Sequence, residues 1–245
     1  QPPFDDVRVR KALAMALDRE YIVENVMTPG FQPAYSFVPP GIANYVSDDE
    51  RPQVSWAELP REERLIEARS LLEAAGYGPD RPLRFTYMYR STGDNRKPPP
   101  VAQANWKQIA DWVEPELLLQ DTKVLYNRLR EADFEFSDAG WVADFNDPHN
   151  FLYLLDSETG QLNYGNHANA EFDALLRASN TELDMEKRAE LLAQAEQIML
   201  DEMPLSPMWF QVNQNLVDPE LTGWEDNVVD IHRSRYLCYP ELSSQ

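Results

Sequence analysis

The residues best suited to chemistry lie in one short segment, Ala-Gly-Trp-Val-Ala-Asp-Phe-Asn-Asp-Pro, over residues 139–148. Asp144 follows a strand-like aromatic run and lies close in sequence to Trp141 and Phe145. A carboxylate pairs with an amine by charge, and aromatic ring faces attract cations. The segment therefore predicts a binding site for a ligand amine at Asp144. The alternative for Asp144 is a helix cap or a buried ion pair, and the alternative for Trp141 is ordinary core packing.

A second acidic group, Asp147, precedes Pro148 and a helix-like run over residues 151–155. An aspartate side chain accepts hydrogen bonds from the free N–H groups of a helix start, and proline fits the first helical turn. We therefore expect a helix that begins near Pro148 and a structural role for Asp147.

No other group of residues predicts catalysis or metal binding. The three histidines, His149, His167 and His232, do not lie at metal-ligand spacing with cysteine or with one another. The sequence has no Gly-rich phosphate loop and no Gly-x-Ser-x-Gly motif. Cys238 is the single cysteine, which excludes an internal disulfide, and we expect it to be buried and inert. We therefore expect no enzyme activity, no cofactor and no metal.

The charge and hydropathy of the chain exclude some classes of binding partner. The 245 residues carry a formal net charge of −20, which argues against nucleic acid and against anionic membrane surfaces. No run of 18 apolar residues occurs, so we expect no membrane insertion. The chain opens directly ahead of a predicted helix and without a signal peptide, which suggests an excised piece of a longer protein.

The order of predicted elements indicates an α/β fold. Apolar residues at helical spacing, and alternating or continuous apolar runs, predict helices over residues 7–27 (one or two), 60–75, 101–112, 122–132, 169–179 and 184–202, and strands over 83–89, 116–120 and 134–143. Their alternation predicts a partly parallel sheet. Ligands bind beyond the carboxyl ends of such strands, so residues 134–143 should open onto a ligand face. The long segment 31–53 should be an ordered, functional loop.

Several segments resemble one protein family. Residues 139–148 resemble the Trp-x-Ala-Asp-Tyr-x-Asp/Glu-Pro segment of the periplasmic oligopeptide- and dipeptide-binding proteins of ABC importers. Residues 3–19 resemble the family's Val-Arg-x-Ala-Leu…Asp-Arg helix signature, and residues 33–40 resemble the loop that follows it. Residues 67–77 resemble its Ala-Lys-x-Leu-Leu-x-Glu-Ala-Gly-Tyr/Phe helix. These segments occur in the family's order over nearly the whole chain.

The resemblance implies a fold and a location. The family folds as two α/β lobes that are joined by a hinge and clamp the ligand between them. Residues 1–212 are then the C-terminal ligand-binding lobe, a mixed sheet flanked by helices. Residues 213–245 are a tail that returns toward an N-terminal lobe absent from this chain, and we expect this tail to pack less well than the rest. The full-length parent would be periplasmic, or lipid-anchored and extracellular.

The resemblance also implies site residues. Asp144 would pair with the α-amino group of a bound peptide. The main chain of Gly140, Trp141, Val142 and Ala143 would hydrogen-bond the extended ligand like an added strand.

Three positions depart from the pattern of some relatives. Asp138 stands where some oligopeptide binders carry an arginine, and Asn95 stands where some carry a histidine that meets the ligand's far end. We include both as candidate ligand-binding residues. Val142 occupies a position where some relatives have a cysteine, so the cystine that ties this loop in them is absent.

Two functions fit the resemblance. The first is capture of peptides for ABC import, with a permease as partner. The second is ligand sensing by a domain of the same fold in a bacterial transcription regulator. An upstream signal peptide would select the first, and an upstream helix-turn-helix the second. The ligand itself remains open.

Overall fold

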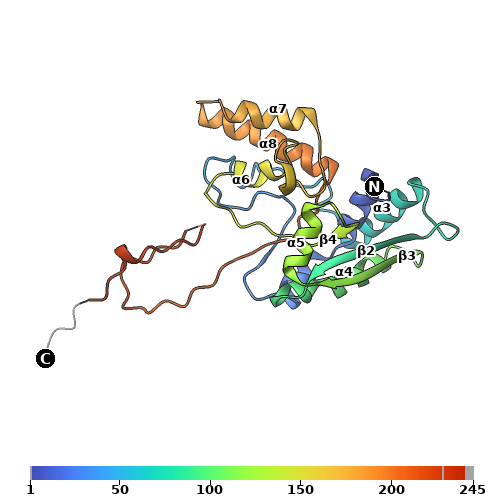
Figure 1. Cartoon of the computed structure of the whole chain (residues 1–245), viewed down its shortest axis with the longest axis horizontal. Helices are drawn as coiled ribbons and strands as arrows, with labels where there is room; N and C mark the ends of the chain where they lie inside the picture. The colour runs from blue at the N-terminus through green and yellow to red at the C-terminus, as the bar shows by residue number, and fades with distance from the viewer. Residues whose placement is uncertain (1, 228, 241–245) are drawn as a thin grey trace.

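The structure, a computed structural model, describes residues 2–227 and 229–240 (Figure 1). Its helices are α1 Val7–Ala16, α2 Arg19–Asn25, α3 Arg61–Ala74, α4 Pro98–Lys107, α5 Thr122–Arg130, α6 His149–Leu152, α7 Ala170–Ser179 and α8 Met185–Glu202. Its strands are β1 Gln32–Pro33, β2 Leu83–Arg90, β3 Val113–Gln120, β4 Phe136–Ser137 and β5 Trp209–Phe210. The predicted α/β class is confirmed.

Five of these helices begin at a side-chain cap. In each case an aspartate or asparagine just before the helix accepts a hydrogen bond from a backbone N–H of the first turn; these residues are Asp6, Asp18, Asp121, Asn169 and Asp184. Such caps satisfy backbone donors that have no partner inside the helix. The positions of the helices are therefore encoded locally in the sequence.

The central sheet has the strand order β3-β2-β4, with all three strands parallel. Alternate residues of β2 face opposite sides of the sheet. Phe85 lies on the side of α4, where its ring packs edge-on to Trp106. Met88 lies on the other side, where it packs with Leu125 and Leu129 of α5. A separate antiparallel pair joins β1 to β5.

Several predicted boundaries were wrong; the helix expected to end at Trp112 ends at Lys107, and the strand expected from Glu116 begins at Val113. The strand expected over residues 134–143 is confined to β4. After Ser137, one further backbone hydrogen bond joins this segment to β2 among the described residues, from Asp138 N to the Met88 carbonyl at 3.0 Å. Helix α4 begins at Pro98 and not at Val101. Prolines fit the first turn, since the N–H groups there have no intrahelical acceptor.

The long loop predicted over residues 31–53 is anchored to α8 by a buried carboxylate. Glu196 Oε1 accepts hydrogen bonds from the backbone N–H groups of Phe37 at 2.6 Å and Val38 at 2.9 Å, and Oε2 accepts one from the Tyr45 hydroxyl. Burial raises the pKa of Glu196 to about 6. A loop of mostly irregular backbone is thus held in one position by side-chain acceptors.

A fully buried arginine joins the segments next to β1 and β5. Arg19 Nε donates to the carbonyls of Ala34 at 3.0 Å and Pro207 at 2.9 Å, and Nη1 donates to the Ala14 carbonyl at 2.9 Å. Its guanidinium also lies over the rings of Tyr35 and Trp56. These contacts satisfy a buried charge with backbone oxygens and aromatic faces.

The last part of the chain leaves the body of the molecule as an extended arm (Figure 1). In the described part of the tail most side chains are exposed, including Tyr236, while Trp224 stacks on His232 at 3.6 Å between ring centroids. Residues 228 and 241–245 of the tail lie outside the described residues. Cys238 is exposed, so the expectation of a buried thiol was wrong; the arm offers no apolar core to cover it.

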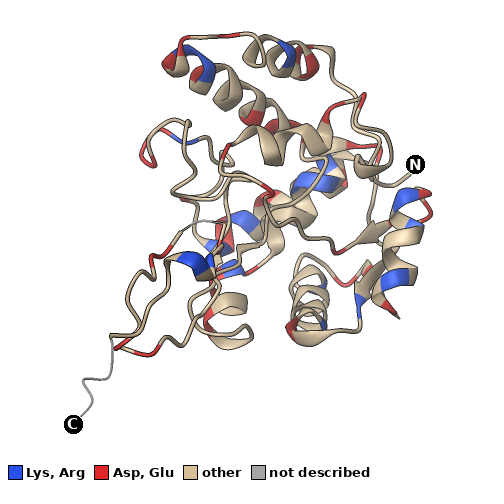
Figure 2. Ribbon diagram, turned by 60° about the vertical axis from the view of Figure 1, so that its left-hand side comes forward, with Lys and Arg blue, Asp and Glu red and all other residues tan. Residues whose placement is uncertain are grey.

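Acidic residues occur throughout the ribbon and do not gather in one cluster (Figure 2). Among the described residues, no helix is long and apolar enough to cross a membrane.

Candidate functional site

The candidate binding segment, residues 139–144, begins just past the carboxyl end of β4. The main chain of residues 139–143 makes no hydrogen bond with any other described residue. The Val142 side chain is 74% exposed, and Gly140 is exposed as well. A row of unpaired backbone donors and acceptors on an exposed segment can pair with an extended ligand, as an edge strand pairs with an added strand.

Asn150 of α6 fixes this segment at two points. Its Oδ1 accepts a hydrogen bond from the Trp141 indole Nε1 at 2.9 Å and another from the Asp144 backbone N at 3.1 Å. The Trp141 ring also packs edge-on to Tyr153 at 5.8 Å between centroids. Trp141 therefore has a packing role through its ring, while its own backbone groups stay unpaired.

The Asp144 side chain is exposed and has no hydrogen bond or ion pair with any described residue. Among the described residues, Asp144 therefore neither caps a helix nor forms a buried ion pair. Burial raises the pKa of Tyr153, and the charge of Asp144 adds to that effect. Asp144 thus contributes an available negative charge near Tyr153.

Asp147 has the predicted structural role. Its Oδ1 accepts a hydrogen bond from the His149 backbone N at 3.0 Å, at the start of α6. Its two carboxylate oxygens also pair with both terminal nitrogens of Arg188 on α8, at 2.8 Å and 2.9 Å. This bidentate pair, in which each side chain is 14% exposed, ties the end of the segment to α8.

The long loop also reaches the segment. Asn146 Oδ1 accepts a hydrogen bond from the Ala43 backbone N at 2.8 Å, and Asn44 Nδ2 donates to Asp147 at 3.4 Å. The predicted functional loop therefore supports the turn that follows Asp144.

Arg90, at the end of β2, contacts the candidate residues Asp138, Asn95 and Gly140. Its Nε donates to Asp138 Oδ2 at 2.9 Å and its Nη2 to Asn95 Oδ1 at 3.2 Å, in the short 3₁₀ helix η1 Gly93–Arg96. Its Nη1 donates to the Tyr126 hydroxyl at 3.2 Å. Gly140 lies against the same guanidinium, since a Cβ on Gly140 would sit 3.6 Å from Nη2 and 3.8 Å from Nη1.

Asp138 is held inside this cluster. Its side chain is only 8% exposed, and its second oxygen, Oδ1, is buried without a described partner. Burial raises the pKa of Asp138, although the charge of Arg90 acts in the opposite direction. Asp138 and Asn95 therefore both contact Arg90, which lies against Gly140 of the binding segment. Asp144 is at the opposite end of that segment and has no contact with this cluster among the described hydrogen bonds.

The candidate site thus includes residues that the sequence prediction omitted: Arg90, Asn146 and Asn150. The sequence does carry a signal for Arg90: it is an arginine at the end of the predicted strand 83–89, and Asp138 lies in another predicted strand of the same sheet. Asn150, one turn into the helix after Pro148, offers a weaker signal. No group of three or more His, Cys, Asp or Glu side chains arranged to hold a metal ion occurs among the described residues.

Comparison with known proteins gives a consistent result. The sequence pattern of the bacterial extracellular solute-binding proteins, family 5 (middle region), matches residues 1–163. The chain is 35% identical to the periplasmic oligopeptide-binding protein OppA of Salmonella typhimurium over 223 residues, which is 91% of this chain and 40% of that protein. It therefore spans well under half the length of this relative.

Solved structures show the same likeness. The murein tripeptide-binding protein MppA of Escherichia coli superposes with a TM-score of 0.86 at 31% identity, over 98% of this chain and 46% of that one. OppA of Haemophilus influenzae, in complex with the peptide RPPGFSPFR, gives a TM-score of 0.86 at 31% identity, over 98% and 46% of the two chains. Together, the sequence match over residues 1–163 and the shared fold place this chain among the bacterial extracellular solute-binding proteins of family 5.

Proposed function

We propose that this chain is the ligand-binding lobe of a solute-binding protein that captures peptides for ABC import. The N-terminal lobe of the full-length protein and an ABC permease are its partners, and the full-length protein is periplasmic or lipid-anchored and extracellular. The relatives reported above are named as peptide-binding proteins. This favours the proposal over a ligand-sensing domain of a transcription regulator.

One observation carries the proposal: the exposed Asp144 carboxylate directly follows residues 139–143, whose backbone makes no hydrogen bond with any described residue. Asp144 offers a charge partner for an α-amino group, and residues 139–143 offer hydrogen bonds to an extended main chain. A peptide supplies both groups at once. Binding of this kind recognises main-chain groups, so it accepts many side chains.

The test is calorimetric titration of the full-length protein with tetra-alanine and with its N-acetylated form. When the two lobes exclude water, the amine and Asp144 form a buried pair. Asp144→Ala should then weaken tetra-alanine binding by roughly 2–5 kcal/mol, the usual cost of removing one partner of such a pair. Acetylation should weaken binding by a similar amount in the wild type and by little in the variant.

Asp80→Ala is the matched control, because Asp80 is exposed and lies on a turn before β2. It should leave both affinities unchanged. Tight tetra-alanine binding by Asp144→Ala would show that another residue receives the amine.

A further inference from the structure

Two carboxylates, Asp144 and Asp147, lie three residues apart in the chain, and their surroundings are opposite. Asp144 is exposed, and its side chain has no hydrogen bond or ion pair with any described residue. The Asp147 side chain is only 14% exposed. An ionised carboxylate offers about four acceptor sites on its two oxygens, and in Asp147 each oxygen accepts two hydrogen bonds. Asp147 is therefore fully used by the protein, whereas Asp144 is available.

The partners of Asp147 come from three parts of the chain. Its Oδ1 accepts hydrogen bonds from the His149 backbone N at 3.0 Å and from Arg188 Nη2 at 2.8 Å. Its Oδ2 accepts hydrogen bonds from Asn44 Nδ2 at 3.4 Å and from Arg188 Nη1 at 2.9 Å. Arg188 is the partner that brings a full positive charge, and it does so in the bidentate geometry that gives strong pairs.

The charges of Arg188 and Asp147 oppose each other at a neighbouring group. Burial lowers the pKa of the His149 side chain from its ordinary value of 6.5, so this ring is neutral at about pH 7.5. Asp147 acts to raise the pKa of His149, and Arg188 acts to lower it. The pair therefore presents a much smaller field to its neighbours than the Asp147 carboxylate alone would present.

Asp147 is close enough to affect a ligand amine at Asp144. An extended chain advances about 3.3 Å per residue, so the Cα atoms of the two residues are at most about 10 Å apart. The turn between them is tighter than that, since Asp147 N donates to the Phe145 carbonyl at 3.0 Å. At an effective dielectric constant of about 20, two unit charges about 10 Å apart interact by more than the thermal energy. An uncompensated charge on Asp147 would therefore strengthen the attraction for the amine.

We propose that Arg188 is a specificity-determining residue that does not contact the ligand: by cancelling the charge of Asp147, it leaves Asp144 as the one net negative charge that the ligand amine meets in this segment. This role rests on the proposed function. It sets how strongly the site prefers a charged amino terminus over a neutral one, and so limits that preference to the contribution of a single carboxylate.

The measured quantity is the amine preference, defined as the Kd of N-acetyl-tetra-alanine divided by the Kd of tetra-alanine. Calorimetry on the full-length protein gives both constants at about pH 7.5. Arg188→Gln uncovers the charge of Asp147 and should raise the amine preference roughly threefold or more. Asp147→Asn uncovers the charge of Arg188 and should lower the amine preference by a similar factor. A purely structural role of the pair would weaken both peptides equally and leave the ratio unchanged.

The double variant separates charge cancellation from damage to the turn. Arg188→Gln combined with Asp147→Asn removes both charges together, and the new asparagine keeps an acceptor for the His149 backbone N. Its amine preference should return to within about twofold of the wild type. Damage to the turn would instead accumulate when the two changes are combined.

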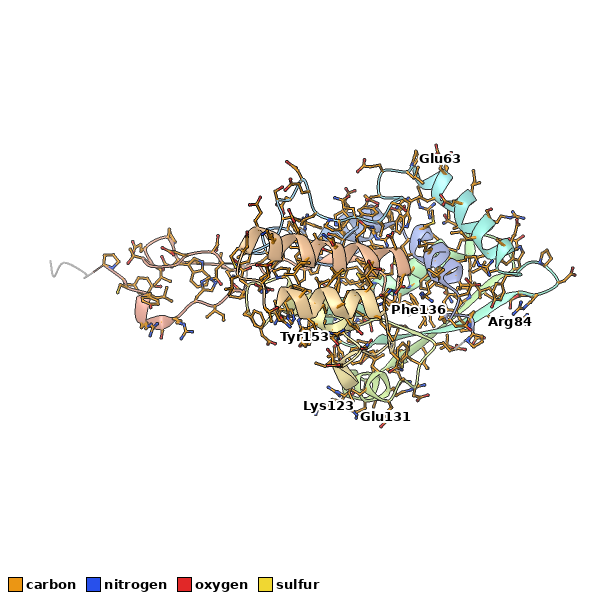
Figure 3. The ribbon with its side chains drawn as sticks, turned by 90° about the horizontal axis from the view of Figure 1, so that it is seen from above. Glu63, Arg84, Lys123, Glu131, Phe136 and Tyr153 are labelled. Atoms are coloured by element: carbon orange, nitrogen blue, oxygen red, sulfur yellow. The ribbon has the colours of Figure 1, made fainter. Side chains whose placement is uncertain are left out.

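Arg84→Gln is the matched control, because it also breaks an arginine–acid pair. Arg84 of β2 pairs with Glu114 of β3 at 2.6 Å. Figure 3 shows Arg84 well away from Tyr153, whose ring packs against Trp141 of the binding segment. The control should keep the wild-type amine preference. An amine preference that is unchanged or lower in Arg188→Gln, or that fails to return in the double variant, overturns the role of Arg188.

The two proposals fail differently. If Arg188 has no part in specificity, the amine preference is the same in every variant of the Arg188–Asp147 pair, but Asp144→Ala still abolishes it. If tetra-alanine does not bind the wild type, or if Asp144→Ala keeps the full amine preference, the proposed function fails and the role of Arg188 fails with it.

Discussion

At the scale of single residues, the geometry of the candidate site depends on side chains that lie outside the binding segment. Asn150 is buried, and one oxygen of its side chain holds both the Trp141 indole and the Asp144 backbone. The position of the Asp144 carboxylate therefore depends on a polar residue of α6. Arg90 has a similar relation to Asp138 and Asn95, which orient it from two different elements.

Asn150→Ala should lower the free energy of unfolding by roughly 1–3 kcal/mol, because it leaves two donors without their acceptor. It should also weaken peptide binding by the full-length protein, since the backbone at Asp144 loses its anchor. Urea unfolding and calorimetry measure the two effects. Asn127→Ala, on the exposed side of α5, is the control and should change neither quantity. A stable variant with unchanged affinity would show that Trp141 packing alone orders the segment.

At the scale of elements, α8 connects the loop and the binding segment. Glu196 of α8 accepts hydrogen bonds from the backbone of Phe37 and Val38. Arg188, eight residues before Glu196 on α8, pairs with Asp147. The loop in turn contacts Asn146. The three elements therefore form one connected network, in which α8 supports the site from a distance.

Glu196 should give the stability a defined pH dependence. Burial raises its pKa in the folded state from 4.5 to about 6, so between these values the folded state binds more protons than the unfolded state. The contribution of Glu196 to stability is then largest below pH 4.5 and is lost as the pH rises through about 6. The loss is about 2 kcal/mol, at 1.36 kcal/mol per pKa unit.

Glu196→Gln should remove this term while it keeps an acceptor for the loop. The free energy of unfolding of the variant, relative to wild type, should rise by about 2 kcal/mol between pH 4 and pH 7. Urea unfolding at the two pH values measures it. Glu190→Gln, exposed on the same helix, should show no such change. A difference between variant and wild type that stays constant with pH would contradict the raised pKa.

The elements also show how far the sequence could predict the structure. Helices α3 and α8 and strand β2 follow local periodicity, and capping residues such as Asp184 fix the helix starts. The strand at 134–143 was predicted too long because Phe134 and Phe136 alternate like a strand, whereas pairing with β2 ends at Ser137. The alternation of apolar residues along one segment does not predict where its pairing with a neighbouring strand ends.

The candidate site shows the same division. Asp144 and Trp141 could be selected from residue type and spacing, and the structure places them on one segment, where Asp144 is exposed and Trp141 is partly buried. The Arg90–Asp138 pair joins residues 48 apart in sequence, and only the parallel register of β2 and β4 brings them together. Contacts of this kind depend on tertiary structure, so the sequence can mark Arg90 as an arginine at a strand end but does not reveal which residue it pairs with.

At the scale of the whole molecule, the proposed function makes this chain one wall of a peptide site and gives the other wall to a second lobe. Without the second lobe, a peptide amine beside Asp144 stays in water, where an ion pair contributes roughly 0–1 kcal/mol. We expect the isolated chain to bind peptides no more tightly than about 1 mM, or about −4 kcal/mol. Calorimetry with tetra-alanine on this chain measures it, with the full-length protein as the reference. Micromolar binding by the chain alone would show that closure of two lobes is not required.

Strand β3 affects how the molecule behaves at high concentration. It is an outer strand of the sheet, and it carries Pro115 between Glu114 and Glu116. A proline has no N–H to offer to a strand of another molecule, and glutamates on two such edges repel each other. The Pro115 carbonyl is also already paired, since it accepts a hydrogen bond from Gln103 Nε2 of α4 at 2.8 Å, so this part of β3 works against edge-to-edge aggregation. Together with the net charge of −20, these features should keep the chain dispersed as single molecules in concentrated solution.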